Sequence, residues 1–503
     1  MSLLGIDVGT SGCKSALFSE DGRLLRLAYE EYDFQHPQPG WAELDVPTVW
    51  ALVKKTIRRA AGGAGGDPIR GICVSSMGEA VVPVTSSGEI LGPSMLNFDT
   101  RGDEFLPELS SSLPVEHLYQ LNGNTLGSPY TLTKLKWLKE NQPDVYRQAG
   151  AFLHWSGFVS FMLGAKPCVD YSLANRTLLF DLENKAWSDE LLIWAGLDRE
   201  KLPPTVPSGQ VIGAVSPASA EELGLPVGTP IISGGHDQCC NSLGCGVIEP
   251  GTAMYGMGSY LCMVPVFTQR PEPAQMIQRG LNTEDHVVPG QFVSFIYNQG
   301  GVLVKWFRDT FAQAERARAV ESGDNLYTAL FAEIPEAPSK IMVLPHFTTT
   351  GPPNFINDSC GVIAGLKLET TRGEILKGIV ESATFYLRQC FEDFAGTGIP
   401  IREFSAVGGG SQSDAWVQLS ADILGRPFSR PQVNEAGALG AAILAGTGAG
   451  RFPSLRSGVE RMVRPGRRFE PDPIQQRRYD ERFARYRSFA PAMEEYMREF
   501  ITA

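Results

Sequence analysis

Short apolar runs and glycine-rich turns alternate at the start of the chain. Leu3 to Val8 is a largely apolar run, Gly9 to Gly12 is a turn, and Cys13 to Phe18 alternates in polarity. An "EDG" turn leads into a third such run, Arg23 to Tyr29. The apolar first run, the alternating second run and the turns between the runs predict three consecutive strands. Because the glycines join strand to strand, they match neither a dinucleotide-binding fingerprint nor a P-loop, both of which require a following helix.

Helical spacing follows, and the pattern then returns to strands. Trp50, Val53, Ile57 and Ala60 recur every three to four residues and predict an amphipathic helix. The run "IRGICVSS" predicts a strand, and "AVVPVTSSGEIL" is hairpin-like.

The second half of the chain repeats the strand and glycine-turn patterns of the first half. In "PIISGGHDQCCNSLGCG" an apolar strand ends in glycines and a carboxylate, and "GTAMYGMGSYLCMV" repeats strand, glycine turn and strand. We therefore expect two related domains that face one cleft. Farther on, "FSAVGGGSQSDAWVQLSADILG" predicts strand, turn and helix, and "EAGALGAAILAG" predicts a helix whose small residues permit close packing. A long amphipathic helix is expected from Pro473 to about Phe500.

Composition narrows the classes of function. The chain has 503 residues and a formal net charge of −12, so a basic surface for nucleic acid or an anionic membrane is not expected. Nine cysteines without paired CxxC spacing, behind a start that does not resemble a signal peptide, predict reduced thiols in a cytoplasm. No apolar run is long enough to span a bilayer, so we expect a soluble protein.

Asp7 and the turn after it form the first candidate site. Glycine amides can approach phosphate oxygens, the hydroxyls of Thr10 and Ser11 add donors, and Lys14 adds a cation, while Asp7 can hold Mg²⁺. An ordinary hairpin with a turn aspartate explains the same residues, and this segment alone leaves both interpretations open.

Asp237 in "GGHDQ" is the second candidate. A carboxylate placed after a strand could accept the proton of an attacking hydroxyl, although Asp is also a favoured helix N-cap. A metal site made of His236 with Cys239, Cys240 and Cys245 has poor ligand spacing.

A third candidate combines "AVGGGSQSDAW" with Lys305. Three glycines would allow close approach of an adenine or ribose, but a tight strand-to-helix loop accounts for them equally. Lys305, one turn into a helix opened by Gly300 and Gly301, could reach a nucleotide or simply lie exposed.

Taken together, these stretches resemble the FGGY family of carbohydrate kinases over nearly the whole chain. The resemblance rests on "GIDVGTSGCKSALF", "PGWAELDVPTVW", "NFDTR", "YTLTKLKWLKEN", "DYSLANRTLLFDL", "GGHDQCCNSLG", "GGGSQSDAWVQLSADILGRP" and "EAGALGAAILAG". It implies an α/β fold of two actin-like, ribonuclease-H-like domains, residues 1–247 and 248–503. These domains would close over ATP, Mg²⁺ and a sugar or polyol, with a hinge near residue 247.

The resemblance also implies roles for particular residues. Asp237 matches the catalytic base, and with Asp7 it is expected near the metal. The nucleotide and its phosphates are expected at Asp7, Gly9, Thr10, Ser11, Lys14, Gly256, Gly258, Ser259, Gly301, Lys305, Gly409, Gly410 and Asp414. Met257 replaces the threonine usual in the second phosphate turn.

The acceptor side departs more from the family's patterns. Xylulokinase-like members carry Met-His where this chain has Met77 and Gly78, and glycerol-kinase-like members place an arginine before the carboxylate that matches Glu79. Glu79 is the expected hydroxyl-binding residue. The full expected acceptor site is Met77, Gly78, Glu79, Asp99, His236 and Tyr260.

The expected function is ATP-dependent phosphorylation of a primary hydroxyl of a small sugar, with a ketopentose such as xylulose as first candidate. Glycerol or another linear polyol is the alternative acceptor. Two further alternatives are a non-catalytic binding protein of the actin or Hsp70 kind and a decayed kinase that acts as a regulator. Homodimers are common in this family, so a homodimer is a further hypothesis.

Overall fold

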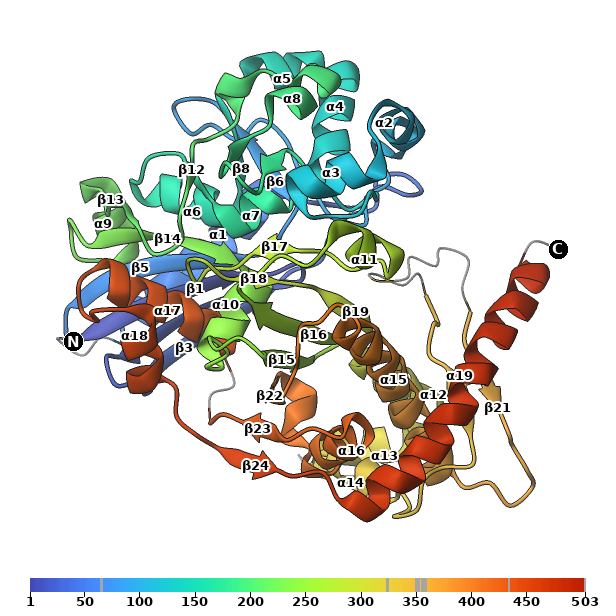
Figure 1. The fold of residues 1–503 in the computed structure, drawn as a ribbon. Coiled ribbons are helices and arrows are strands. Elements are labelled where there is room, and N and C mark those ends of the chain that lie inside the picture. Colours follow the sequence, from blue (N-terminus) through green and yellow to red (C-terminus); the bar gives the residue numbers. More distant parts are fainter. Residues whose placement is uncertain (64–66, 323–324, 349–352, 354–359, 433–434, 502–503) are drawn as a thin grey trace.

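Two mixed sheets form the centre of the computed structural model, which describes residues 1–63, 67–322, 325–348, 353, 360–432 and 435–501 (Figure 1). All strands of the first sheet precede residue 237, and all strands of the second follow residue 251. Each sheet thus comes from one half of the chain, as the repeated sequence pattern predicts. The domain boundary at residue 247 stays a prediction.

The first sheet has the strand order β13-β14-β5-β1-β2-β3. The three strands predicted at the N-terminus are antiparallel neighbours, and β5 and β14 continue the sheet parallel to β1. Their bounds are β1 (Ser2–Val8), β2 (Gly12–Ser19), β3 (Leu24–Glu31), β5 (Ile69–Ser76), β13 (Val211–Ala214) and β14 (Pro230–His236). The connection from β3 to β5 contains the predicted helix α1 (Val46–Ala61), capped by the Asp45 carboxylate on the Thr48 amide and buried along Val49, Val53 and Ile57.

The second sheet repeats this arrangement. Strand β15 pairs antiparallel with β16 and parallel with β22, which in turn pairs parallel with β23. Its bounds are β15 (Thr252–Met257), β16 (Tyr260–Phe267), β17 (Glu284–Asp285), β18 (Phe292–Val293), β19 (Ile296–Gln299), β22 (Glu403–Val407), β23 (Phe428–Arg430) and β24 (Arg467–Phe469). The internal repeat is therefore confirmed.

Helices of the second half surround this sheet in the lower right of Figure 1. They include α12 (Gly301–Phe311), α15 (Arg372–Ala395), α16 (Asp414–Leu424) and the long C-terminal α19 (Pro473–Ile501). The expected amphipathic stripe of α19 is confirmed, since Tyr479, Phe483 and Tyr486 are buried in the same core as Phe385.

One helix of the second half lies against the first sheet. Helix α17 (Ala436–Gly448) contacts β1, β5 and α10 (Asp237–Gly244), as Figure 1 shows. Backbone meets backbone here: a Cβ on Gly244 would lie 1.8 Å from the Ala436 carbonyl oxygen, and one on Gly440 would lie 2.0 Å from that of Cys240. These pairs make the two helices antiparallel and explain why the sequence is so rich in glycine and alanine.

A helical layer covers the other side of the first half, at the top of Figure 1. It contains α3 (Val115–Asn122), α4 (Thr131–Asn141), α6 (Trp155–Leu163) and α7 (Tyr171–Asn175), with the strands β6 (Val81–Val84) and β8 (Ala151–His154). The hairpin-like turn predicted at 80–91 is present but short: Val84 and Ile90 form an antiparallel bridge, and the Leu91 amide donates to the Pro83 carbonyl at 3.0 Å. The other neighbour of β6 is β8, with which all four of its residues pair. Among the described residues, no helix combines the length and apolarity that crossing a bilayer requires.

Candidate active site

Asp7 lies near the end of β1, in the middle of the first sheet. The β-ladders place it opposite Lys14 on β2 and Ser75 on β5, and the Ser75 hydroxyl donates a hydrogen bond of 2.9 Å to Asp7 Oδ1. Burial raises the pKa of Asp7, while Lys14 and Ser75 act against that rise. A Cβ on Gly437 would lie 3.2 Å from Asp7 Oδ2, so the glycine at the start of α17 leaves room beside the carboxylate.

The turn after Asp7 is held from its own backbone and from Tyr32. The Gly9 amide donates to the Gly12 carbonyl at 2.9 Å, and the Tyr32 hydroxyl donates to the Gly9 carbonyl at 2.6 Å. The side-chain hydroxyls of Thr10 and Ser11 make no hydrogen bond to any described residue. The turn is therefore fixed in shape while its hydroxyls stay available, which is the arrangement expected of a phosphate-binding turn.

Lys14 is paired across the two halves of the chain. Its Nζ lies 2.8 Å from Glu435, the residue just before α17. The predicted phosphate cation thus already has a carboxylate partner, and that partner is supplied by the second half.

Asp237 is the first residue of α10, immediately after β14. Because β14, β5 and β1 are parallel, their carboxyl ends meet at one edge of the sheet, which brings Asp237 to the edge where Asp7 lies. The N-cap is His236, not Asp237, so the N-cap alternative is wrong. Burial, then the carboxylates of Asp7 and Glu79, raise the pKa of Asp237 to about 7. A carboxylate tuned in this way suits a general base near neutral pH.

Glu79 follows β5 and points to the same region. Arg176, just after α7, donates from Nε to Glu79 Oε1 at 2.9 Å. A Cβ on Gly78 would lie 3.2 Å from His236 Nε2 and 3.3 Å from Arg176 Nε. The absence of a side chain at Gly78 therefore makes room for an imidazole and a guanidinium that come from other elements.

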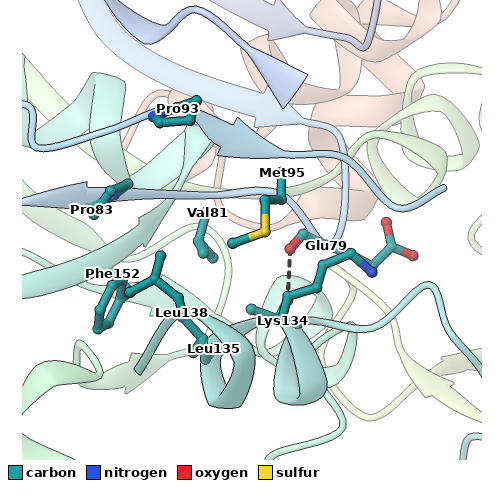
Figure 2. Close-up of a pocket in the computed structure, with 10 residues that line it drawn as sticks. Glu79, Val81, Pro83, Pro93, Met95, Lys134, Leu135, Leu138 and Phe152 are labelled. Carbon is teal, nitrogen blue, oxygen red and sulfur yellow. Dashed lines mark hydrogen bonds between the residues drawn. The ribbon is translucent and has the colours of Figure 1, made fainter. Parts of the chain in front are cut away.

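A small cavity lies on the inner side of Glu79, as Figure 2 shows. The Thr131 hydroxyl donates to the Glu79 carbonyl at 2.7 Å beside it, and apolar side chains such as Val81, Leu138 and Phe152 form much of its wall. Its volume is about 10 Å³, enough for roughly one water molecule. This cavity is therefore not the acceptor site.

The second turn joins β15 to β16 and is built from backbone. The Gly301 amide donates to the Gly258 carbonyl at 3.0 Å, and a Cβ on Gly301 would lie 2.4 Å from that oxygen. A Cβ on Gly410 would lie 3.0 Å from the Met257 carbonyl oxygen. The structure thus brings together the glycines of three separated segments, with Ser259 beside them and Gly256 in β15. The Met257 side chain is buried in the core.

Two residues predicted to bind the nucleotide, Lys305 and Asp414, form ion pairs with other side chains. The Lys305 side chain is 63% exposed and pairs with Asp309 at 3.1 Å, one helical turn away. Asp414 forms ion pairs with Arg430, at 2.8 Å, and with Arg467. Their roles in nucleotide binding stay predictions.

The carboxylate of Asp99 already accepts several hydrogen bonds from within the protein. Its carboxylate accepts hydrogen bonds from the Ala42 amide at 2.7 Å and from the Arg101 amide and Nε, each at 2.9 Å. Arg101 also pairs with Glu43 at 2.7 Å. The cluster ties two loops together and leaves Asp99 little capacity for an acceptor.

The remaining acceptor candidates are Met77, His236 and Tyr260, and their roles stay predictions. Met77 is buried and its amide donates to the Val8 carbonyl at 2.9 Å. The His236 ring packs edge-on against Phe295, with centroids 4.9 Å apart, and its Nε2 lies 3.3 Å from Asp237 Oδ1. Tyr260 is partly exposed, with its ring 5.8 Å from that of Tyr297.

Sequence analysis missed Arg176, Glu284 and Phe295. Arg176 lies within "DYSLANRTLLFDL", which carried the family resemblance, yet its charge was not singled out. Glu284 and Phe295 reach the site from the second half, and nothing local to them signals this placement.

A metal would have few protein ligands here. Among the described residues, no group of three or more His, Cys, Asp or Glu side chains is arranged to hold one. Mg²⁺ commonly uses one or two carboxylates, with waters and substrate phosphates completing its shell. The carboxylates of Asp7 and Asp237 fit that requirement.

Known proteins share both the sequence pattern and this fold. The N-terminal domain model of the FGGY family of carbohydrate kinases matches residues 2–244, and the C-terminal domain model matches residues 265–449. An autoinducer-2 kinase of Klebsiella pneumoniae is 30% identical, over 97% of this chain and 93% of its own length. A xylulose kinase of Rhodospirillum rubrum superposes with a TM-score of 0.87 at 25% identity, covering 99% of this chain and 100% of that one.

A more distant structure supports the fold. The glycerol kinase of Plasmodium falciparum, solved with ADP, superposes with a TM-score of 0.83 at 18% identity, over 96% of this chain and 98% of that one. Both family models together span most of the sequence. The chain therefore belongs to the FGGY family of carbohydrate kinases.

Proposed function

We propose that this kinase transfers the γ-phosphoryl group of ATP to a primary hydroxyl of a small sugar or polyol, with Asp237 as general base. The observation that carries the proposal is the position of Asp237. It stands at the carboxyl edge of the first sheet, where burial, and then the carboxylates of Asp7 and Glu79, raise its pKa to about 7.

The residues divide the work of the reaction. Glu79, held by Arg176, accepts a hydrogen bond from one acceptor hydroxyl and so fixes the acceptor's orientation. Asp237 takes the proton of the hydroxyl whose oxygen forms the new bond to phosphorus. Thr10, Ser11 and the backbone of both turns bind phosphate oxygens.

Magnesium fits the first turn. When bound, Mg²⁺ would neutralise phosphate charge. Asp7, with Asp237 at the same edge, would hold it directly or through water. Lys14 would then be free to exchange Glu435 for a phosphate oxygen.

Two acceptors are candidates. A ketopentose such as xylulose is the first, supported by the similarity to a xylulose kinase over the whole chain. Autoinducer-2 is the second, supported by relatives named for that activity at 30–31% identity over most of the chain. Gly78, in place of the histidine of xylulokinase-like members, also favours testing the second.

The cysteines support the cellular setting expected from the sequence. All nine are free thiols, and seven of them are buried. We propose a reducing compartment, the cytoplasm, for this reaction.

The test is ADP release with Mg-ATP across pentuloses, hexuloses, glycerol, longer polyols and autoinducer-2, run beside Asp237→Asn. One preferred acceptor should emerge, and its turnover should fall by at least about a hundredfold in the variant, which is the usual contribution of a general base. Asp422→Asn, which removes a buried aspartate that accepts from the Asp472 amide in the second half, should keep turnover. Slow ADP release at the same rate with every acceptor, and at the same rate in Asp237→Asn as in wild type, would favour a nucleotide-dependent binding protein.

A further inference from the structure

One arginine is shared by two carboxylates from opposite halves of the chain. Arg176 donates from Nε and Nη2 to Glu79 Oε1 and from Nη1 to Glu284 Oε1. Its guanidinium carbon also lies over the ring of Tyr130, 5.2 Å from the centroid, and over that of Phe295, 5.4 Å from the centroid. Burial opposes its charge, but Glu284 and Glu79 outweigh burial and raise the pKa of Arg176, so it stays charged.

This arrangement leaves one oxygen of each glutamate free and occupies the Nε/Nη2 fork of the guanidinium. Both bonds to Glu79 end on Oε1, and Oε2 accepts none from any described residue. Glu284 Oε2 is likewise buried without a hydrogen-bond partner. The Nε/Nη2 fork of Arg176 is therefore taken by Glu79 and one Nη1 hydrogen by Glu284, whereas a hydroxyl donor on the acceptor would find an acceptor oxygen.

The surrounding charge also disfavours an anionic acceptor. Burial and the carboxylate of Glu79 raise the pKa of Glu284, while Arg176 lowers it. A further carboxylate on the acceptor would lie near the carboxylates of Glu79 and Glu284, and like charges repel.

The strand that carries Glu284 is anchored by other contacts. Asp285 pairs with Lys185 at 2.6 Å, its amide donates to Asn175 Oδ1 at 2.9 Å, and Thr283 and Tyr119 hydroxyls lie 3.1 Å apart. Removing the Glu284 charge should therefore leave β17 in place.

Resting on the proposed function, we propose that Glu284 is a positioning residue that acts through Arg176. It holds the guanidinium so that Glu79 Oε2 faces the acceptor, and it makes the site selective for uncharged polyhydroxy acceptors over sugar acids.

The test compares Glu284→Gln with wild type. The KM for the preferred neutral acceptor should rise about tenfold, the scale of one charge-assisted hydrogen bond, while kcat changes much less. Inhibition constants for xylitol and D-xylonate, which share a five-carbon chain and differ in charge, should shift in favour of xylonate by a similar factor. Glu284→Asp should recover part of both effects.

The matched control is Asp285→Asn, which removes a charge from the same strand without touching Arg176. It should leave the ratio of the two inhibition constants unchanged. An equal shift in this control, or no shift in Glu284→Gln, overturns the inference. Should Glu284→Gln fail to fold, Arg176→Lys, which keeps the charge but loses the fork, must give the same shift in the ratio. A wild-type enzyme without acceptor-dependent turnover would instead overturn the proposed function.

Discussion

The two strand–turn–strand units, β1–β2 and β15–β16, hold equivalent places in their sheets and carry different chemistry. One residue before the end of its first strand, the first unit has Asp7, paired across the hairpin with Lys14. The second has Gly256 at that position, paired with Cys262. The repeated topology therefore supplies two turns at which backbone can meet phosphate, and the side chains decide which of them handles charge.

The residues around the two turns differ in the same way. The first turn has free hydroxyls and a cation paired with Glu435, whereas the second is packed against the backbone around Gly301 and Gly410. We infer that the first turn binds its ligand mainly through charge and the second mainly through the shape of its backbone.

The largest expected effect comes from removing the charge of the first turn. Asp7→Asn keeps the size of the side chain and should lower kcat/KM by about a hundredfold or more, since metal and phosphate positioning dominates phosphoryl transfer. Steady-state kinetics with varied Mg²⁺ would measure it. Asp67→Asn, at an exposed aspartate 3.4 Å from the N-terminal amine, is the control and should match wild type. An active Asp7→Asn enzyme would break the comparison.

The next effect should come from the shape of the second turn. In Gly301→Ala the new Cβ would collide with the Gly258 carbonyl, so the turn must move. We expect the KM for ATP to rise severalfold, and the free energy of unfolding to fall by about 1–3 kcal/mol. The KM for the acceptor should stay nearly constant. Gly62→Ala, where the nearest atom to a Cβ is 3.5 Å away, controls for adding a methyl group.

A smaller effect concerns pH and the carboxylates at the first turn. Because the pKa of Asp237 is raised to about 7 in the folded state, folding favours its protonated form. Ionising it costs stability progressively as pH rises from about 4 to about 7, and the cost is constant above that. In the absence of nucleotide and metal, the urea midpoint of Asp237→Asn minus that of wild type should therefore increase between pH 5 and 7. Above pH 7 this difference should stay constant. A difference independent of pH would contradict this.

The smallest effect should be at the position equivalent to Asp7. In Gly256→Ala the nearest atom to the new Cβ, Cys262 Cβ, is 3.4 Å away, which is an ordinary contact. We expect kcat/KM to stay within about twofold of wild type. A loss as large as that of Asp7→Asn would show that both turns depend on more than their backbone.

Local pattern predicted much of this molecule. The N-terminal strands, helix α1, the β15–β16 unit and α19 follow from periodicity and turn residues over a few positions. The short turn after β6 was also predicted, but the pairing of β6 with β8, some seventy positions along the chain, was not, because such pairing leaves no local signal.

The candidate site shows the same limit. Asp7, Glu79 and Asp237 each end or follow a strand of one parallel set, so their convergence could be inferred from the sequence. The contact between Arg176 and Glu284 spans 108 positions. The need for glycine at position 78 is explained only by the neighbouring side chains of Arg176 and His236, which come from distant parts of the chain. Asp99 matched a family pattern, yet the cluster around Arg101 already uses its oxygens.

The place of α17 has a consequence for how the protein is made. A ribosome synthesises the six strands of the first sheet before residue 237, but the helix that covers β1 and β5 ends at Gly448. The nascent first half must therefore wait with the α17-facing side of its sheet uncovered until most of the second half has been translated. We expect a chain released early, at residue 247, to expose that face and to aggregate, and expect a separately synthesised second half to rescue it only while α17 can still dock.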